Sequence, residues 1–346
     1  MNDKHNRGDA RGRFWLPTLL ALLILSTFLS LGWGSTEVGF ADVMTAIGQL
    51  KPGGEDAETS AANIILRIRL PRTILALLIG ALLAISGAIM QVFFRNVMAG
   101  PYLVGVSSGA SLGAVLAMLC GWGIRWWKFS PVPLAAFVFA LATVGLVYLI
   151  NRRRGRLETE GLLLTGIAIA SAVSAVVSLL LIMSRDSVNK VLFWLLGSLS
   201  AARWEHVEIL LPYAVIGLVV ALLLSRDLDL LLWGDVTGAA LGVNVERSRL
   251  VLLILASLMT AAAVSVSGVI GFVGLMVPHI ARFLVGVMHR TLIPAAAILG
   301  GILLLWADIL ARTVWAPTEL PLGAITAIVG APFLVYLCTR TGKRAK

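Results

Sequence analysis

The sequence predicts an all-α integral membrane protein, and three observations support this. Hydrophobic residues make up 59% of the 346 residues, charged residues make up 13%, and the mean hydropathy is +0.94, which is too apolar for a soluble globular domain. Apolar stretches of about 20 residues recur along the chain, and each can cross a bilayer as a helix. The Lys and Arg residues between these stretches are unevenly distributed, which orients the chain in the membrane.

Ten apolar stretches qualify as transmembrane helices. They lie at residues 14–32, 73–94, 103–121, 131–150, 161–183, 207–224, 250–267, 269–287, 292–311 and 321–339. The first is too long for a cleaved signal peptide and no A-x-A site follows it, so we expect it to remain as a span. The seventh and eighth form one apolar run too long for a single helix, and its glycines predict a break between them.

An even number of spans places both termini on the same side of the membrane. If that side is the cytoplasm, the inner segments carry the larger share of Lys and Arg, as the positive-inside rule requires. Residues 1–13 are then a disordered cytoplasmic segment, 14–339 form the transmembrane domain, and 340–346 are a cytoplasmic tail. The net charge of +10 belongs to this orientation, so we do not expect nucleic-acid binding.

The longest inner segment, residues 225–249, is too polar to span a membrane. It reads SRDLDLLLWGDVTGAALGVNVERSR and contains helix signals, with Asp235 as the expected cap and Gly242 as the stop. Two interpretations remain open for it: a solvated loop helix, or a helix presented to a cytoplasmic partner.

A group of arginines on the outer side runs against the charge pattern. Arg67, Arg69 and Arg72 lie together in RIRLPR, just before the second span. They either belong to a short interfacial helix whose arginines snorkel to the headgroups, or form a docking patch for an acidic partner.

Small residues recur at four-residue spacing in two of the spans. One set is Ala76, Gly80, Ala84 and Ala88, and the other is Gly105, Gly109 and Gly113. Small residues let membrane helices approach closely, so we expect tight helix packing at most of these positions.

The eighth span combines a helix breaker with polar side chains. Pro278 follows the glycine-rich run, and backbone breaks at membrane depth are tolerated only where protein or a water-filled cavity surrounds them. We therefore expect this segment inside the bundle. His279 could ligate a metal or haem, but a polar group satisfied by nearby backbone is the favoured interpretation. Arg282 is expected at the inner surface or at helix-end carbonyls.

The sequence lacks the motifs of several functional classes. The chain has no G-x-x-x-x-G-K-[ST] and hence no nucleotide-binding P-loop. No carboxylate lies at the middle of a span, Asp308 being near the outer end of the ninth, which disfavours a proton-coupled carrier. No catalytic or metal-ligand spacing indicates an enzyme, and we expect no cofactor.

Five stretches resemble the permease subunits of FecCD/BtuC-like ABC importers, which take up iron chelates, haem and vitamin B12. They are RLPRTILALLIGALLAISGAIMQ (69–91), RNVMAGPYLVGVSSGASLGA (95–114), LGVNVERSR (241–249), SGVIGFVGLMVPHIARFLVG (267–286) and ADILARTVWAPTELPLGAITAIVGAPFL (307–334). The chain departs from the family at Val97 and Met98, where Pro and Leu are usual, and this leaves the shape of that inner turn open.

The resemblance implies a BtuC-like bundle of ten transmembrane helices in a prokaryotic plasma (inner) membrane. It implies a homodimer around a central pathway, two cytoplasmic ABC ATPase subunits and an extracytoplasmic substrate-binding protein; a heterodimer with a related permease remains open. An iron chelate (a ferric siderophore or haem) is the expected solute, with vitamin B12 as the alternative. A secondary carrier working without ATP is a more distant alternative, and a membrane-embedded enzyme is disfavoured.

The resemblance also assigns roles to individual residues. Residues 227–246 would dock into the ATPase, with prominent positions at Trp233, Asp235, Gly238 and Gly242. The cytoplasmic gate would comprise Asn96, Met98 and Thr159, although Asn96 could instead merely cap a helix. Binding-protein docking would use Arg69, Arg72 and Arg312. The broken eighth helix would contain Gly271, Gly274, Pro278 and His279.

Overall fold

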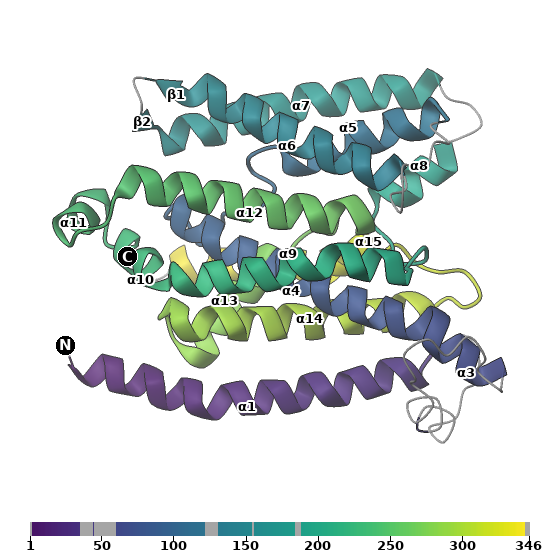
Figure 1. Ribbon diagram of the computed structural model, residues 1–346, viewed down its shortest axis with the longest axis horizontal. Coiled ribbons are helices and arrows are strands. Elements are labelled where there is room, and N and C mark those ends of the chain that lie inside the picture. The colour runs from purple at the N-terminus through teal and green to yellow at the C-terminus, as the bar shows by residue number, and fades with distance from the viewer. Residues whose placement is uncertain are drawn as a thin grey trace.

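The structure is a bundle of long helices. The computed structural model describes residues 2–34, 44, 60–121, 131–153, 156–183 and 188–342. Besides helices, these residues form two strands of two residues each, β1 (Arg152–Arg153) and β2 (Arg156–Leu157), which pair antiparallel. The long helices lie side by side along the longest axis, and both chain termini are marked at the end where α10 and α11 lie (Figure 1).

Seven helices among the described residues are long and apolar enough to cross a membrane. They are α1 (Asn2–Gly32), α4 (Leu70–Phe93), α6 (Pro131–Asn151), α7 (Thr159–Met183), α9 (Trp204–Leu223), α12 (Val245–Ser267) and α14 (His289–Thr313). Three further apolar helices are shorter: α5 (Val106–Leu119), α13 (Val273–Val285) and the Leu322–Leu337 part of α15 (Leu322–Gly342). The remaining short helices are α3 (Ser60–Ile64), η1 (Ile65–Arg69), α8 (Val188–Leu195), α10 (Ser225–Leu231) and α11 (Asp235–Ala240).

Each of the ten predicted segments overlaps one of these apolar helices, and the all-α membrane class is confirmed. The sequence did not predict α8. The structure also differs at the N-terminus, because α1 begins at Asn2 and so includes most of the segment expected to be disordered. Adding residues to a helix that the apolar part has already nucleated costs less than starting a new helix, so polar residues can extend it. At the other terminus, residues 343–346 of the expected tail lie outside the described residues.

Helix α4 is the centre of the bundle. It packs against α14, α12, α9 and α13, and most of its side chains are buried. Gly80 of α4 faces Gly300 of α14 so closely that a Cβ on either residue would overlap the carbonyl oxygen of the other. The small-residue spacing therefore serves close helix packing here, as predicted.

A second group of helices, α5, α6 and α7, packs beside this centre. Gly109 and Gly113 of α5 lie against Phe139 and Ala135 of α6, where a Cβ at either glycine would meet the backbone carbonyl of α6. Helix α12 contacts both α4 and α6 and thereby joins the two groups (Figure 1).

Arg67, Arg69 and Arg72 belong to one nearly continuous helical run, formed by α3, η1 and α4. The π-helical turn η1 ends at Arg69, two residues before Pro71, and the Leu70 N–H donates to the Ile65 carbonyl five residues back. Proline lacks an N–H and its ring crowds the carbonyl four residues earlier, so a widened turn at this place accommodates it.

Candidate functional site

The predicted break between α12 and α13 lies in the interior of the bundle. Gly268 (φ 71°) ends α12, and Phe272 (φ 66°) precedes α13 in a left-handed conformation that is uncommon for a bulky residue. The Tyr102 hydroxyl donates to the Ile270 carbonyl at 2.6 Å, so a carbonyl of the break is satisfied by protein.

The residues predicted for the broken helix are Gly271, Gly274, Pro278 and His279. Gly271 lies in the break, and Pro278 is buried inside α13. Gly274 lies so close to α4 that a Cβ on Gly87 would overlap its carbonyl oxygen. The His279 ring meets the Phe333 ring of α15 edge to face, with centroids 5.9 Å apart. No group of three or more His, Cys, Asp and Glu residues in the described part of the chain could hold a metal ion.

Arg282 binds the side chain of another transmembrane helix. Its Nη1 donates to Oε1 of Gln91 on α4, and Nε2 of Gln91 donates to the Leu275 carbonyl at 3.0 Å. The charge inside the eighth span is thus paired with a buried amide, and the pair fixes α13 against α4. Gln91 received no role from the sequence.

The α10–α11 segment exposes apolar side chains at the end of the bundle. Trp233 is 75% exposed and Val236 is 86% exposed. Gly242 follows α11 with a φ of 90°, as expected for a helix stop. Gly238 instead lies buried, and a Cβ there would make only ordinary van der Waals contact with Leu231, so packing within the chain does not require a glycine at this position.

Three aspartates bind this segment to three different parts of the bundle. Asp227 accepts a hydrogen bond from Ser248 of α12 at 2.7 Å. Asp229 accepts from the backbone N–H of His289 at 3.0 Å and pairs with its Nδ1 at 2.6 Å, which joins α10 to α14. Asp235 binds Arg249 of α12 at 2.9 Å and lies 3.8 Å from Arg95, which follows α4.

Asp235 is therefore not the cap of α11. It is the first helical residue, the cap position belongs to Gly234, and the carboxylate of Asp235 binds arginine. The sequence cannot show whether Asp235 is the cap or the first helical residue, because this depends on which distant residue its carboxylate binds.

The residues predicted for the gate lie near this network. Asn96 accepts from the Met98 N–H at 2.9 Å and so holds a tight turn, whereas the next helix, α5, begins only at Val106. Thr159 is the first residue of α7, and its hydroxyl accepts from Arg249 at 2.9 Å. One arginine thus contacts a predicted gate residue and a predicted coupling residue.

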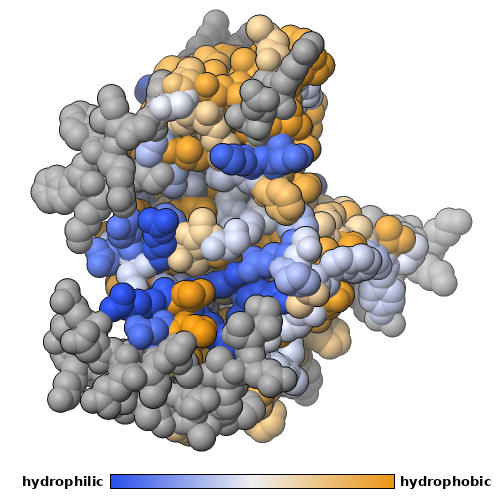
Figure 2. All heavy atoms as spheres, turned by 90° about the vertical axis from the view of Figure 1, so that its right-hand side faces the viewer, coloured by the Kyte–Doolittle hydropathy of each residue, from blue (hydrophilic) through white to orange (hydrophobic). Residues whose placement is uncertain are grey.

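At the opposite end, Arg72 is buried in a network of ion pairs. Its Nε donates to Asp308 at 2.9 Å, and its two terminal nitrogens donate to Glu319 at 2.7 and 3.0 Å. Asp308 is completely buried and also pairs with Arg312 at 3.0 Å. Figure 2 looks onto this end, where hydrophilic residues gather near the middle and apolar residues surround part of them.

The other two arginines predicted for docking are also buried and bound within the chain. Arg312 donates to the Ser30 hydroxyl at 3.1 Å, and Arg69 donates to the carbonyls of Leu31 and Gly32 at 2.7 and 2.9 Å. Both tie α1 to the central helices. The three arginines outnumber the two carboxylates of Asp308 and Glu319, so this group is net positive.

Residues 22–340 match the model of the FecCD transport family. The chain belongs to this family. It is 46% identical to the cobalamin import system permease protein BtuC of Halobacterium salinarum, over 80% of this chain and 74% of that protein. It is 38% identical to the hemin transport system permease protein HmuU of Yersinia pestis, over 96% and 97% of the two chains.

A solved ABC transporter of the metal-chelate type, in an inward-facing conformation, has the same fold. The TM-score is 0.80 at 31% identity, over 94% of this chain and 98% of that one. The protein is thus a permease of a FecCD-type ABC importer, and its family consists of transport proteins and not of enzymes.

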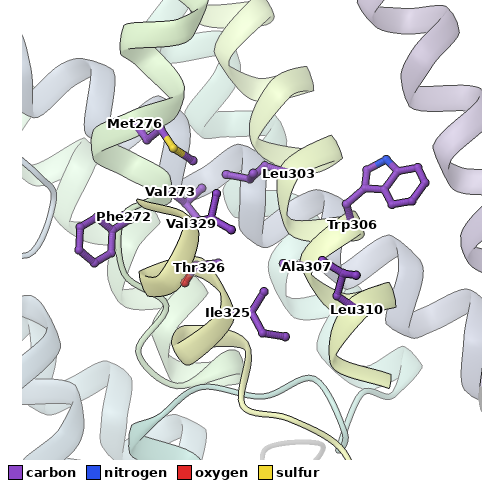
Figure 3. A pocket seen from close by; sticks show the side chains of 10 residues that line it. All are labelled: Phe272, Val273, Met276, Leu303, Trp306, Ala307, Leu310, Ile325, Thr326 and Val329. Atoms are coloured by element: carbon purple, nitrogen blue, oxygen red, sulfur yellow. The ribbon is translucent and has the colours of Figure 1, made fainter. Parts of the chain in front are cut away.

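An apolar cavity in this FecCD permease lies between α13, α14 and α15 (Figure 3). It measures about 80 Å³ and is lined by Phe272, Val273, Met276, Leu303, Trp306, Ala307, Leu310, Ile325, Thr326 and Val329. Ligand pockets usually measure about 300–1,000 Å³, so this cavity is too small for a metal chelate. The side-chain donors of the lining are already bound: the Thr326 hydroxyl donates to the Gly323 carbonyl, and Nε1 of Trp306 donates to the Ser26 hydroxyl at 3.1 Å.

Sequence reasoning assigned no role to Arg249, Gln91, Glu319 or Phe272. All four lie in stretches that carry the family resemblance, but no local pattern names the partners of the first three. The conformation of Phe272 could not be predicted either, because a positive φ at a bulky residue contradicts local preference.

Proposed function

We propose that two copies of this chain enclose the membrane pathway of a binding-protein-dependent importer for a metal chelate. The observation that carries the proposal is the 31% identity over 94% of the chain to the metal-chelate transporter. In this arrangement both termini and α10–α11 face the cytoplasm, the arginine end faces outward, and the membrane is the prokaryotic plasma (inner) membrane. All ten apolar helices would cross it.

The need for a second copy is supported by α7. Little of this apolar helix is buried within one chain, and Leu164, Leu179 and Ile182 are exposed on it. The exposed hydroxyl of Ser171 lies on the same helix and is bound to the Ile167 carbonyl. Such a face, with small polar residues among apolar ones, suits contact with a second copy at a pathway.

Crosslinking tests this assignment in a cysteine-free background. Ser171→Cys should yield a disulfide-linked dimer in membranes, whereas Ile24→Cys, an exposed position on α1, should not. Crosslinking at Ile24 alone would contradict the proposed interface. Formation of the dimer by this chain expressed without a related permease would favour the homodimer over the heterodimer.

The solute requires a transport measurement. An iron chelate is the first candidate, and the 46% identity to a cobalamin permease supports a corrinoid as the second. The importer, reconstituted in liposomes with its ATPase and binding protein, should take up one of three probes: haemin, a ferric hydroxamate or cyanocobalamin. Uptake without ATP, driven by an ion gradient, would instead support a secondary carrier.

ATPase docking is assigned to residues 227–246. The support is the exposure of Trp233 and Val236, because large apolar side chains exposed together in a polar loop suit a protein partner. Gly242 is exposed, and nothing would meet a Cβ there, so it leaves room for a partner surface.

Binding-protein docking is assigned to the arginine end, with Arg69, Arg72 and Arg312 supplying the positive charge. Because these side chains are bound within the chain, we propose that they act first through their field, which attracts an acidic partner without contact. Direct pairing with Arg72 would require Glu319, which is 37% exposed, to leave it.

A further inference from the structure

Arg249 contacts both a residue of the segment assigned to ATPase docking and a residue assigned to the gate. Its Nη1 donates to the Thr159 hydroxyl at the start of α7, and its Nη2 donates to Asp235 at the start of α11. The guanidinium also lies 6.0 Å from the ring centroid of Phe93, the last residue of α4. A single side chain of α12 therefore contacts three other helices.

The chemistry of arginine makes this contact rigid. Its guanidinium is planar, so the directions toward Thr159 and Asp235 are fixed relative to each other. The Arg249 side chain is 9% exposed, and Asp235 is the carboxylate that binds it. Moving Asp235 away would leave a nearly buried charge without its partner, which is strongly unfavourable. A displacement of α11 is therefore expected to move Arg249 as well, and with it the bond to Thr159.

The surrounding contacts support movement of the segment as one unit. Asp235 also lies 3.8 Å from Arg95, which has a φ of 48° and directly precedes the turn held by Asn96. Each of the two segments predicted for the gate is thus connected to Asp235, the first residue of α11, through one arginine. Arg95 precedes Asn96, and Arg249 binds Thr159.

We propose that Arg249 is a positioning residue that transmits movement of the docking helix α11 to the start of α7 and so couples ATP hydrolysis to opening of the inner gate. The inference rests on the proposed function, in which α10–α11 receives the ATPase and Thr159 borders the pathway. It adds the residue that links the two, a role distinct from either docking or gating.

The test measures solute molecules imported per ATP hydrolysed. It uses the complete importer in liposomes, with whichever of haemin, ferric hydroxamate and cyanocobalamin the wild type accumulates. Arg249→Gln should keep the ATPase bound and hydrolysing ATP, but lower uptake per ATP by roughly tenfold, within the usual range of coupling between sites. Arg249→Lys, which keeps the charge but not the fork, should fall between Gln and wild type. The matched control is Arg247→Gln, an exposed arginine on the same helix, which should retain the wild-type ratio.

A second variant guards against misfolding of the first. Thr159→Val removes one acceptor of Arg249 and leaves its ion pair with Asp235, and it should also lower the ratio. In the Arg249→Gln background, Thr159→Val should have no further effect, because the bond is already absent.

The outcomes separate the inference from the proposed function. A ratio in Arg249→Gln equal to that of Arg247→Gln, or an additive effect of Thr159→Val, would overturn the inference alone. A loss of ATPase binding, ATP hydrolysis and uptake in equal proportion would also overturn it and indicate a purely structural role. Absence of ATP-dependent uptake by the wild-type importer would overturn the proposed function, and the inference with it.

Discussion

The two ends of the bundle both contain arginine–carboxylate pairs, but they use them differently. At the arginine end, Arg72, Asp308 and Arg312 are buried on two helices that already pack tightly, α4 and α14. At the α10–α11 end, the carboxylates are partly exposed and lie on or beside short helices, and their partners lie on α12 and α14 and after α4.

The two networks therefore have different consequences for the protein. A buried network joins helices whose relative position is already determined by packing, so it resists change. Ion pairs between a short exposed segment and several long helices instead make the segment's position depend on all of them. We therefore expect changes at the arginine end to alter mainly stability, and changes at the α10–α11 end to alter mainly partner binding and coupling.

The largest effect is expected from Asp308→Asn. The change leaves Arg312 and part of Arg72 buried without their carboxylate, and breaking a buried pair in this way costs about 3–5 kcal/mol. The measurement is thermal or denaturant unfolding of the purified protein in detergent. A loss of unfolding free energy below about 1 kcal/mol would contradict the view that the buried network at the arginine end mainly stabilises the fold.

A smaller loss of stability is expected from Asp229→Ala. The change removes the acceptor of the buried His289 backbone N–H and of its ring Nδ1, which costs about 1–3 kcal/mol. ATPase co-purification should fall as well, because α10 loses its bond to α14. Arg247→Gln, which changes an exposed charged residue outside the docking segment 227–246, serves as the control. Unchanged co-purification would show that α10 is positioned without this aspartate.

Glu319→Gln should change stability by less than about 1 kcal/mol, because Glu319 is partly exposed. It raises the net positive charge of the arginine end and frees donors of Arg72. Binding-protein docking, measured by biolayer interferometry at two salt concentrations, should become tighter, most clearly at low salt. Weaker docking would contradict an attractive role for these arginines.

The smallest effect on stability is expected from Trp233→Ser. Because Trp233 is 75% exposed, its replacement should change the free energy of unfolding by about 0.5 kcal/mol or less. ATPase co-purification should nevertheless fall markedly. The matched control is Trp315→Ser, since Trp315 is 68% exposed at the arginine end. Equal ATPase binding by both variants would exclude Trp233 from the docking surface.

Much of the fold followed from local properties of the sequence. Hydropathy located the ten apolar segments to within a few residues for most of them, because burial in lipid requires unbroken apolar runs. Glycines located the break before α13, and four-residue spacing located close contacts at Gly80 and Gly109. The first apolar span, 14–32, was located correctly, but α1 continues from it back to Asn2, because polar residues can extend a helix that an apolar stretch has already formed.

The candidate site, like the fold, was predicted only in part from the sequence. Sequence resemblance selected Trp233, Thr159 and Asp235 as residues of interest, and the exposure of Trp233 agrees with a surface role. It could not select their partners, nor reveal that Gly238 faces the interior. A sequence motif identifies a residue of interest but not the residues that it contacts in the folded chain.

The sequence by itself determined which segments are apolar, where the helical run is interrupted and which family the chain resembles, because these properties depend on neighbouring residues. The tertiary structure alone decided that Arg72 meets Asp308, 236 positions away, and that Arg249 meets both Asp235 and Thr159. The physical reason is that the energy of an ion pair depends on distance and on exclusion of water. Both are set by how helices distant in the sequence pack together.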